Sequence, residues 1–293
     1  MTEPSKPFSP RRSWGLILLL TLTLLGCRGG TPAGAKPSTS VTPNLPTDGL
    51  PYLVDPVPDG SFEHDPTDFT QGLIYSQGAL YESTGRNGES KLRRLNAATG
   101  LVEKTQKLAE QHFGEGLAAF DGKLYQLTWT SSVCFVYDQK TLALQKELFY
   151  NGQGWGLATS PSEKLLIFSD GTETVRFLDP SNLITKRTVT VTDGQGQPVG
   201  NVNELEWVRG ELWANIWMTD RIARIDPQTG KVKSWLLLPK LSGQEHDETE
   251  DVMNGIAYDP DADVLWLTGK LWNRVYRFDD VEEKFFSQDS PER

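Results

Sequence analysis

The sequence is poor in cysteine and in histidine. Its 293 residues include two cysteines, Cys27 and Cys134, and three histidines. Cys134 lies in an apolar, strand-like run, which is typical of a buried structural cysteine rather than a nucleophile. No two histidines stand at metal-ligand spacing. We therefore expect a fold without cross-links, and a protein that needs no metal and no other cofactor.

Excess positive charge and long apolar runs are also missing. Lys and Arg number 29 against 39 Asp and Glu, which gives a net charge of −10. Without a basic patch to neutralise phosphates, nucleic acid is not expected as a partner. The longest apolar run, Leu16 to Leu25, is too short for a comfortable transmembrane span.

The N-terminus instead carries the features of an export signal. Arg11 and Arg12 precede the apolar run, which ends in Leu24-Leu25-Gly26-Cys27 and resembles a bacterial lipobox. We predict a lipoprotein signal peptide over residues 1–26 and a lipid on Cys27, with an ordinary signal peptide as the alternative. Residues 27–51, rich in Pro, Ser, Thr and Gly, form a flexible tether. The protein would then be exported and held at the extracytoplasmic side of the cell envelope, touching the membrane only through this anchor.

From Tyr52 onward, short apolar runs alternate with Gly, Asn, Asp and Pro, and no long stretch has helical period, so residues 52–293 are expected to be all-β. A tripeptide ending in Leu or Ile recurs at roughly 40- to 50-residue intervals, the length of a four-stranded propeller blade. Its copies are Gln71-Gly72-Leu73, Glu115-Gly116-Leu117, Trp155-Gly156-Leu157, Asn203-Glu204-Leu205 and Asn254-Gly255-Ile256.

Each tripeptide is followed by a second apolar run and then by a third run with an Asp or Asn turn, such as those at 96–100 and 226–230. Five such units predict one catalytic domain, 52–293, folded as a five-bladed β-propeller. Tyr52 to Val57 is expected to complete the last blade and close the ring. We expect the domain to be monomeric.

Residues that are equivalent between blades should face the same place. Four residues beyond the apolar pair of each second run stand Gly85, Trp129, Asp170, Trp217 and Lys270. This position varies in size and charge, unlike a repeated core position, so it is expected to ring one mouth of the central channel. The tripeptides and the residues just before them would add to that mouth Phe69, Gln71, Phe113, Glu115, Trp155 and Asn203.

This set has the chemistry of a reactive pocket. Aromatic walls would exclude water and raise the pKa of Glu115 towards a value useful for acid–base catalysis. Lys270, Asn203 and Gln71 could donate hydrogen bonds to an oxyanion. Taken singly, the two Trp could be core residues, Asp170 a turn former and Lys270 a surface charge. The glycines flanking Glu115 are expected to let the backbone approach a ligand closely.

The motifs, taken in order, resemble the plant-type and bacterial glutaminyl cyclases, a family of five-bladed propellers. The resemblance runs from about His64 to Phe278 and rests on Phe69-Thr70-Gln71-Gly72-Leu73, Phe113-Gly114-Glu115-Gly116-Leu117, Gly154-Trp155-Gly156-Leu157, Asn203-Glu204-Leu205-Glu206, Trp213-Ala214-Asn215-Ile216-Trp217 and Thr268-Gly269-Lys270-Leu271-Trp272.

This resemblance implies conversion of N-terminal glutaminyl residues of peptides to pyroglutamate with loss of ammonia. It makes Glu115 the general acid and base. It makes Gln71, Asn203 and Lys270 polar substrate-binding residues, and Trp129, Trp155 and Trp217 the aromatic walls of the substrate pocket. From their place at the predicted mouth, Phe69, Phe113 and Asp170 are also expected to bind the substrate. Two other classes stay open: a lipid-anchored propeller that binds peptide or glycan without catalysis, and a hydrolase using a channel-bound Ca²⁺, which would need more converging carboxylates.

Overall fold

A computed structural model describes residues 45–245 and 251–287. The predicted signal peptide, Cys27 and the part of the tether before residue 45 lie outside the described residues, as does His246. No helix among the described residues is both long and apolar enough to cross a membrane.

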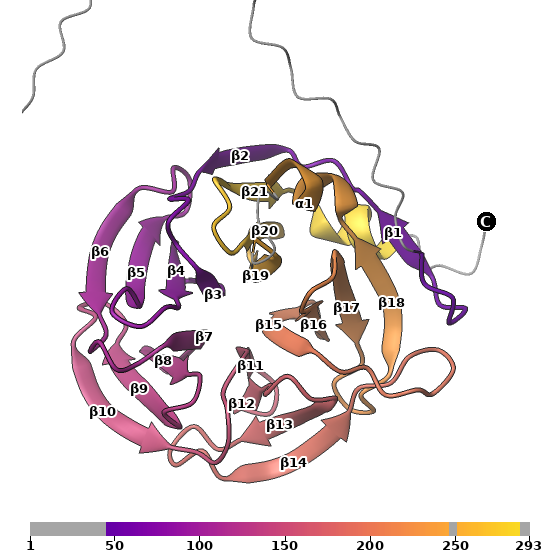
Figure 1. Cartoon of the computed structure of the whole chain (residues 1–293). Helices are drawn as coiled ribbons and strands as arrows, with labels where there is room; N and C mark the ends of the chain where they lie inside the picture. The colour runs from indigo at the N-terminus through magenta and orange to yellow at the C-terminus, as the bar shows by residue number, and fades with distance from the viewer. Residues whose placement is uncertain (1–44, 246–250, 288–293) are drawn as a thin grey trace, which may run out of the picture. The chain divides into compact units, whose positions relative to one another are not determined.

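Five sheets, each with four antiparallel strands, form a ring, and the strand that carries the repeated tripeptide lies nearest the centre in each sheet (Figure 1). This confirms the predicted five-bladed β-propeller. The first two blades contain, in order, β3 (Thr70–Ser76), β4 (Ala79–Thr84), β5 (Lys91–Asn96) and β6 (Val102–Lys107), then β7 (Gly114–Phe120), β8 (Lys123–Thr128), β9 (Val133–Asp138) and β10 (Leu144–Phe149).

The remaining blades follow the same order. They contain β11 (Leu157–Ser160), β12 (Leu165–Phe168), β13 (Thr174–Leu178) and β14 (Thr185–Thr190), then β15 (Val202–Val208), β16 (Glu211–Ile216), β17 (Arg221–Ile225) and β18 (Val232–Leu237), then β19 (Met253–Asp259), β20 (Val264–Gly269) and β21 (Arg274–Phe278). The helix α1 (Pro239–Glu245) links the last two blades, and a π-helical turn, η1 (Glu282–Phe286), follows β21.

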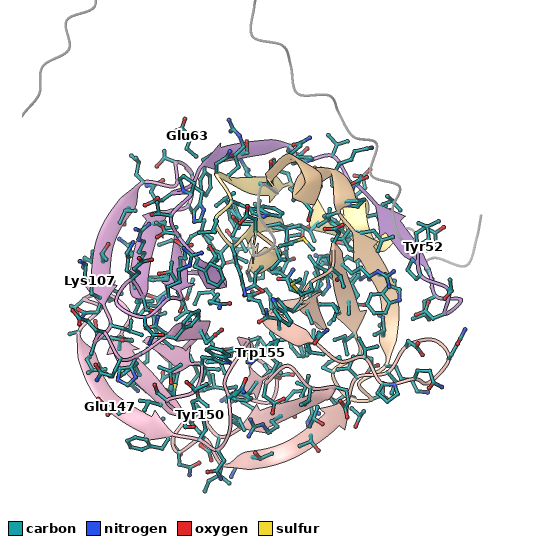
Figure 2. All side chains as sticks on the ribbon, in the orientation of Figure 1. Tyr52, Glu63, Lys107, Glu147, Tyr150 and Trp155 are labelled. Atoms are coloured by element: carbon teal, nitrogen blue, oxygen red, sulfur yellow. The ribbon has the colours of Figure 1, made fainter. Side chains whose placement is uncertain are left out.

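Burial follows strand position within a blade. Every residue of β4 is buried, whereas every residue of β6 is exposed. The outer strands are accordingly polar, and Lys107 and Glu147 lie at the rim, while Trp155 lies beside the channel (Figure 2). Cys134, in β9, is fully buried, as its apolar surroundings predicted.

Turn chemistry fixes the hairpins. The two-residue turns Gln77-Gly78 and Asp121-Gly122 have positive φ at both positions, which matches the twist of the strands they join. The hairpin connections predicted at 96–100 and 226–230 are confirmed. In each, the first side chain accepts hydrogen bonds from two backbone N–H groups further along, as Asn96 does from Ala98 and Thr99.

Ring closure differs from the expectation. The strand that completes the last blade is β2 (Gly60–Glu63), which pairs antiparallel with β21. The segment predicted for that role instead forms β1 (Tyr52–Val54), which pairs parallel with β18 of the fourth blade. Two features favour this arrangement: β18 has a largely buried apolar sequence that β1 helps to cover, and Pro56 and Pro58, which lack N–H donors, interrupt the chain before β2.

The inner strands pack very closely. A Cβ added to Gly116 would stand 2.5 Å from both the Trp155 carbonyl oxygen and the Leu157 nitrogen, and one added to Gly114 would stand 2.6 Å from the Thr84 oxygen. Glycine is therefore required on both sides of Glu115 by packing between strands, not by approach of a ligand. In the fourth tripeptide, Glu replaces Gly, and its carboxylate accepts hydrogen bonds from the backbone N–H groups of Leu73 and Ile256.

Candidate active site

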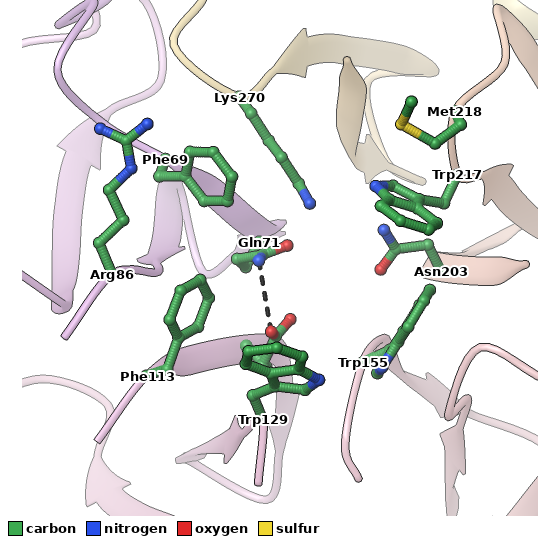
Figure 3. A pocket seen from close by; sticks show the side chains of 11 residues that line it. Phe69, Gln71, Arg86, Phe113, Trp129, Trp155, Asn203, Trp217, Met218 and Lys270 are labelled. Carbon is green, nitrogen blue, oxygen red and sulfur yellow. Dashed lines mark hydrogen bonds between the residues drawn. The ribbon is translucent and has the colours of Figure 1, made fainter. Parts of the chain in front are cut away.

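A cavity of about 440 Å³ opens where the inner strands begin. Glu115, the second residue of β7, lines it. Asn203, the second residue of β15, and Lys270, in the loop after β20, point into it (Figure 3). The side chains that line it are Phe69, Gln71, Arg86, Phe113, Glu115, Trp129, Trp155, Asn203, Trp217, Met218 and Lys270. All the predicted site residues except Asp170 thus come together in one pocket.

Asp170 does not belong to this lining. Its carboxylate accepts hydrogen bonds from the backbone and hydroxyl of Thr172 and forms an ion pair with Arg176 at 3.3 Å. Pairing with the inner strand continues up to Ser169, whose backbone bonds to Gly156 and Trp155. What the register did not reveal is that the carboxylate of the next residue, Asp170, is engaged in stabilising a turn.

Two lining residues were missed by the sequence reasoning, Arg86 and Met218. Each directly follows a predicted ring position, Gly85 or Trp217, and each has a positive φ, 75° and 64°. The residue after Lys270, Leu271, also has a positive φ, of 60°. In each case a residue with left-handed backbone turns the chain at the mouth. The residue one position after each predicted ring position could therefore also have been predicted to lie at the mouth.

Glu115 is the only carboxylate among the lining residues, and its side chain is 4% exposed. Burial raises its pKa well above the ordinary value, and the nearby Lys270 ammonium opposes that rise. Gln71 Nε2 donates to Glu115 Oε1 at 3.3 Å, and Asn254 Nδ2 donates to Gln71 Oε1 at 3.1 Å. These hydrogen bonds hold the carboxyl group in place, and its burial favours the protonated form more than in an exposed carboxyl group.

Aromatic side chains form the walls. Trp155 and Trp217 meet edge to face with centroids 5.5 Å apart, and the Phe113 ring contacts those of Phe69 and Trp129 at 6.1 and 5.7 Å. The outermost of these residues are partly open to solvent, Trp129 being 41% and Trp217 36% exposed. The floor of the pocket is therefore buried, and its mouth is open to solvent.

One residue outside the predicted set supports two of these walls. Gln153 Oε1 accepts hydrogen bonds from the indole N–H of Trp129 at 2.8 Å and from that of Trp155 at 3.1 Å. Because the two indoles come from adjacent blades, Gln153 joins two neighbouring parts of the wall.

Polar groups beside Glu115 can bind a substrate amide. Lys270 Nζ lies 4.9 Å from the centre of the Phe69 ring, which favours a cation there. Asn203 is buried, and its Oδ1 has no hydrogen-bond partner among the described residues. A buried amide oxygen without a partner is costly unless a ligand or water supplies a donor.

A second polar cluster lies outside the pocket lining. His64, Asp68 and Glu82 offer atoms within 4.8 Å of one another, a convergence that the sequence spacing did not reveal. Asp68, however, is paired with Lys91 and Arg93, and His64 Nε2 contacts Glu82 Oε1 at 2.8 Å. With three basic side chains against two carboxylates, the cluster is an ion-pair network rather than a set of ligands awaiting a cation.

Comparisons with known proteins agree on one family. Residues 53–279 match the model of a family described as glutamine cyclotransferase. A glutaminyl-peptide cyclotransferase of Arabidopsis thaliana is 42% identical over 226 residues, which cover 74% of this chain and 68% of that protein. The crystal structure of the glutaminyl cyclase of Myxococcus xanthus is similar with a TM-score of 0.72 and 33% identity, over 78% of this chain and 97% of that one.

Proposed function

Since this chain belongs to the glutamine cyclotransferase family, we propose that it cyclises N-terminal glutaminyl residues of peptides to pyroglutamate through general acid–base catalysis by Glu115. The observation that carries the proposal is a single buried carboxyl group of raised pKa among aromatic walls and amide and amine donors. Such a group can take up and return a proton near neutral pH.

The reaction joins two groups of the same residue. The α-amine nitrogen attacks the γ-carboxamide carbon, a C–N bond forms, and the bond to the amide nitrogen breaks to release ammonia. Glu115 takes a proton from the attacking nitrogen and returns one to the departing nitrogen, so no proton is gained or lost overall. The enzyme must mainly fold the side chain back, since both reacting groups are already tethered.

The other pocket residues would each have a separate role in binding and catalysis. The aromatic walls of Phe113, Trp129 and Trp155 would press the aliphatic part of the glutaminyl side chain into a folded shape and exclude water. The Lys270 ammonium would stabilise the oxyanion that develops on the γ-carbonyl. The unpaired Asn203 Oδ1 would accept a hydrogen bond from a substrate N–H group.

Ammonia release from short peptides tests the proposed function directly. Incubation of residues 45–293 with a Gln-Ala dipeptide should release one ammonia per pyroglutamyl product. Ala-Gln and N-acetyl-Gln should release none, because neither offers a free α-amine that can close the ring on the γ-carboxamide. Absence of product from Gln-Ala would favour the binding-module alternative, and ammonia from N-acetyl-Gln would indicate simple amide hydrolysis.

We also propose that the full chain is exported and anchored at the extracytoplasmic side of the envelope by a lipid on Cys27, on the support of the lipobox-like sequence Leu24 to Cys27. In a bacterial host, the full chain should partition into the detergent phase of Triton X-114 extracts. The Cys27→Ala variant should move to the aqueous phase. Equal partitioning of the two would argue against the lipid.

A further inference from the structure

The opposite end of the channel holds a second cavity, of about 620 Å³. The inner strands β3, β7, β11, β15 and β19 all run in the same direction around the ring, so their first residues line the active-site pocket and their last residues line this cavity. Its walls include Tyr75, Ala119, Thr159, Glu206, Trp207 and Tyr258.

A closed layer separates the two cavities. Between them lie the glycines of the repeated tripeptides, where the strands approach so closely that a Cβ on Gly72 would stand 2.7 Å from the Leu117 nitrogen. The buried Glu204 carboxylate crosses the same layer, bonded to the backbone of β3 and β19. The second cavity is therefore a separate site and not a continuation of the catalytic pocket.

Glu206 places a carboxyl group in this cavity. It stands two residues after Glu204 on β15, so the strand alternation points both side chains to the same side. Its carboxylate accepts a hydrogen bond from the Tyr258 backbone, and no ion pair to it is found among residues 45–245 and 251–287. The basic residue in the lining, Arg209, is engaged by Asp263 at 3.2 Å and Glu282 at 2.6 Å.

The rest of the lining suits an organic group. Tyr75, Trp207 and Tyr258 supply aromatic rings, and Tyr75 is held by stacking on Trp266 at 5.3 Å. Alanines and prolines supply most of the other surface. A calcium site would need six or more converging oxygens, which this lining does not offer. Aromatic rings beside a carboxylate are the usual receptor for an alkylammonium group, and the volume is that of a small-molecule site.

We propose that this cavity binds a small organic ammonium ion, with the charge between Glu206 and the aromatic rings and the alkyl part against the alanines. Burial raises the pKa of Glu206 well above its usual range. Burial also raises the pKa of the nearby Glu204, and the negative charge of Glu206 raises it further. A bound cation favours the ionised carboxylate. The other groups facing Glu206 are Arg209 and the phenols of Tyr75 and Tyr258. Binding near neutral pH should consequently release a proton.

Choline and its neutral isostere, 3,3-dimethylbutan-1-ol, test the proposal by titration calorimetry on residues 45–293. Choline should bind saturably, at least about tenfold more tightly than the alcohol, with an enthalpy that depends on the ionisation enthalpy of the buffer. The Glu206→Gln variant should lose about tenfold in affinity and lose the buffer dependence. Its cyclisation of Gln-Ala should be unchanged, which distinguishes this site from the proposed catalytic function.

Two further variants separate this cavity from the catalytic pocket, which is also aromatic and acidic. Ala119→Leu, which fills the second cavity from β7, should abolish choline binding, whereas Glu115→Gln should leave it intact. The proposal is overturned by the absence of saturable choline binding up to about 50 mM, by equal binding of the alcohol, or by binding that Glu115→Gln removes and Glu206→Gln preserves. Circular dichroism melting checks that each variant is folded.

Discussion

The Glu115→Gln variant is expected to cyclise Gln-Ala about 10² to 10⁴ times more slowly than the unaltered enzyme, because an amide cannot take a proton from the α-amine or deliver one to the leaving ammonia. The substitution keeps the shape of the side chain and its contact with Gln71. The loss should therefore fall on kcat, with a smaller change in KM. Steady-state ammonia release measures both.

The pH dependence should change with the same substitution. The proton-accepting form of Glu115 is the carboxylate, and burial raises the pKa of this group well above its ordinary value. In the unaltered enzyme, kcat/KM should therefore rise with pH through the raised pKa of Glu115, at a higher pH than an exposed carboxyl group would give. The variant should lack this rising limb.

A matched control is available on another inner strand, β15. Glu206 is also a carboxyl group whose pKa burial raises, but it faces the other end of the channel, so Glu206→Gln should leave the cyclisation rate and its pH profile unaltered. Retention of more than about a tenth of the activity by Glu115→Gln would contradict the role assigned to Glu115.

The repeated tripeptides were enough to predict the propeller and its five blades, because each blade must supply one inner strand with a similar packing face. They could not predict how the ring closes. Pairing of β1 with β18, and of β2 with β21, is decided by long-range contacts, and both segments are short and weakly patterned. The strand predicted over Tyr52 to Val57 ends at Val54, and the strand that closes the ring, β2, lies after the prolines and outside the predicted segment.

The pocket was predictable to the extent that the blades are equivalent. Register placed Trp129, Trp217 and Lys270 in the pocket lining. It could not reveal that the Asp170 carboxylate is bonded to Thr172 and Arg176 instead. Gln153 was missed because its contribution, a bridge between two indoles, exists only in three dimensions. The flanking glycines of Glu115 were recognised, but for the wrong physical reason, since packing between strands explains them.

The closure of the ring depends on a buried ion pair, and its disruption should have the largest effect on stability. His64, just after β2, donates through Nε2 to the Glu82 carboxylate in β4 at 2.8 Å, and its Nδ1 donates to the Trp272 carbonyl oxygen at 2.8 Å. The imidazole thus joins the last blade to the first. His64→Ala leaves the Glu82 carboxylate buried with fewer partners and should lower the free energy of unfolding by about 3–5 kcal/mol.

Urea denaturation at pH 7 measures this loss. The control is Lys186→Ala, which removes a half-exposed ammonium paired with Asp179 at 3.1 Å and should cost at most about 1 kcal/mol. His64→Gln is a second variant that fills the space left by alanine and can still donate to Glu82, so a smaller loss is expected from it. A loss below about 1 kcal/mol for His64→Ala would show that the pair does not hold the ring closed.

The pH dependence of stability separates the charge of His64 from its packing. Burial opposes protonation, but the Glu82 carboxylate and the hydrogen bonds to Glu82 and Trp272 outweigh it and raise the pKa of His64 from 6.5 to about 9. Because the folded pKa lies above the unfolded one, the stabilisation is complete below about pH 6.5 and is lost as the pH rises through about 9. Asp68, whose pKa is raised to about 6 by burial, titrates only at the lower end of this window. The difference in free energy of unfolding between the unaltered enzyme and His64→Gln should therefore shrink between pH 6.5 and 9. A difference that stays constant over this range would show that the charge of the imidazole does not contribute to stability.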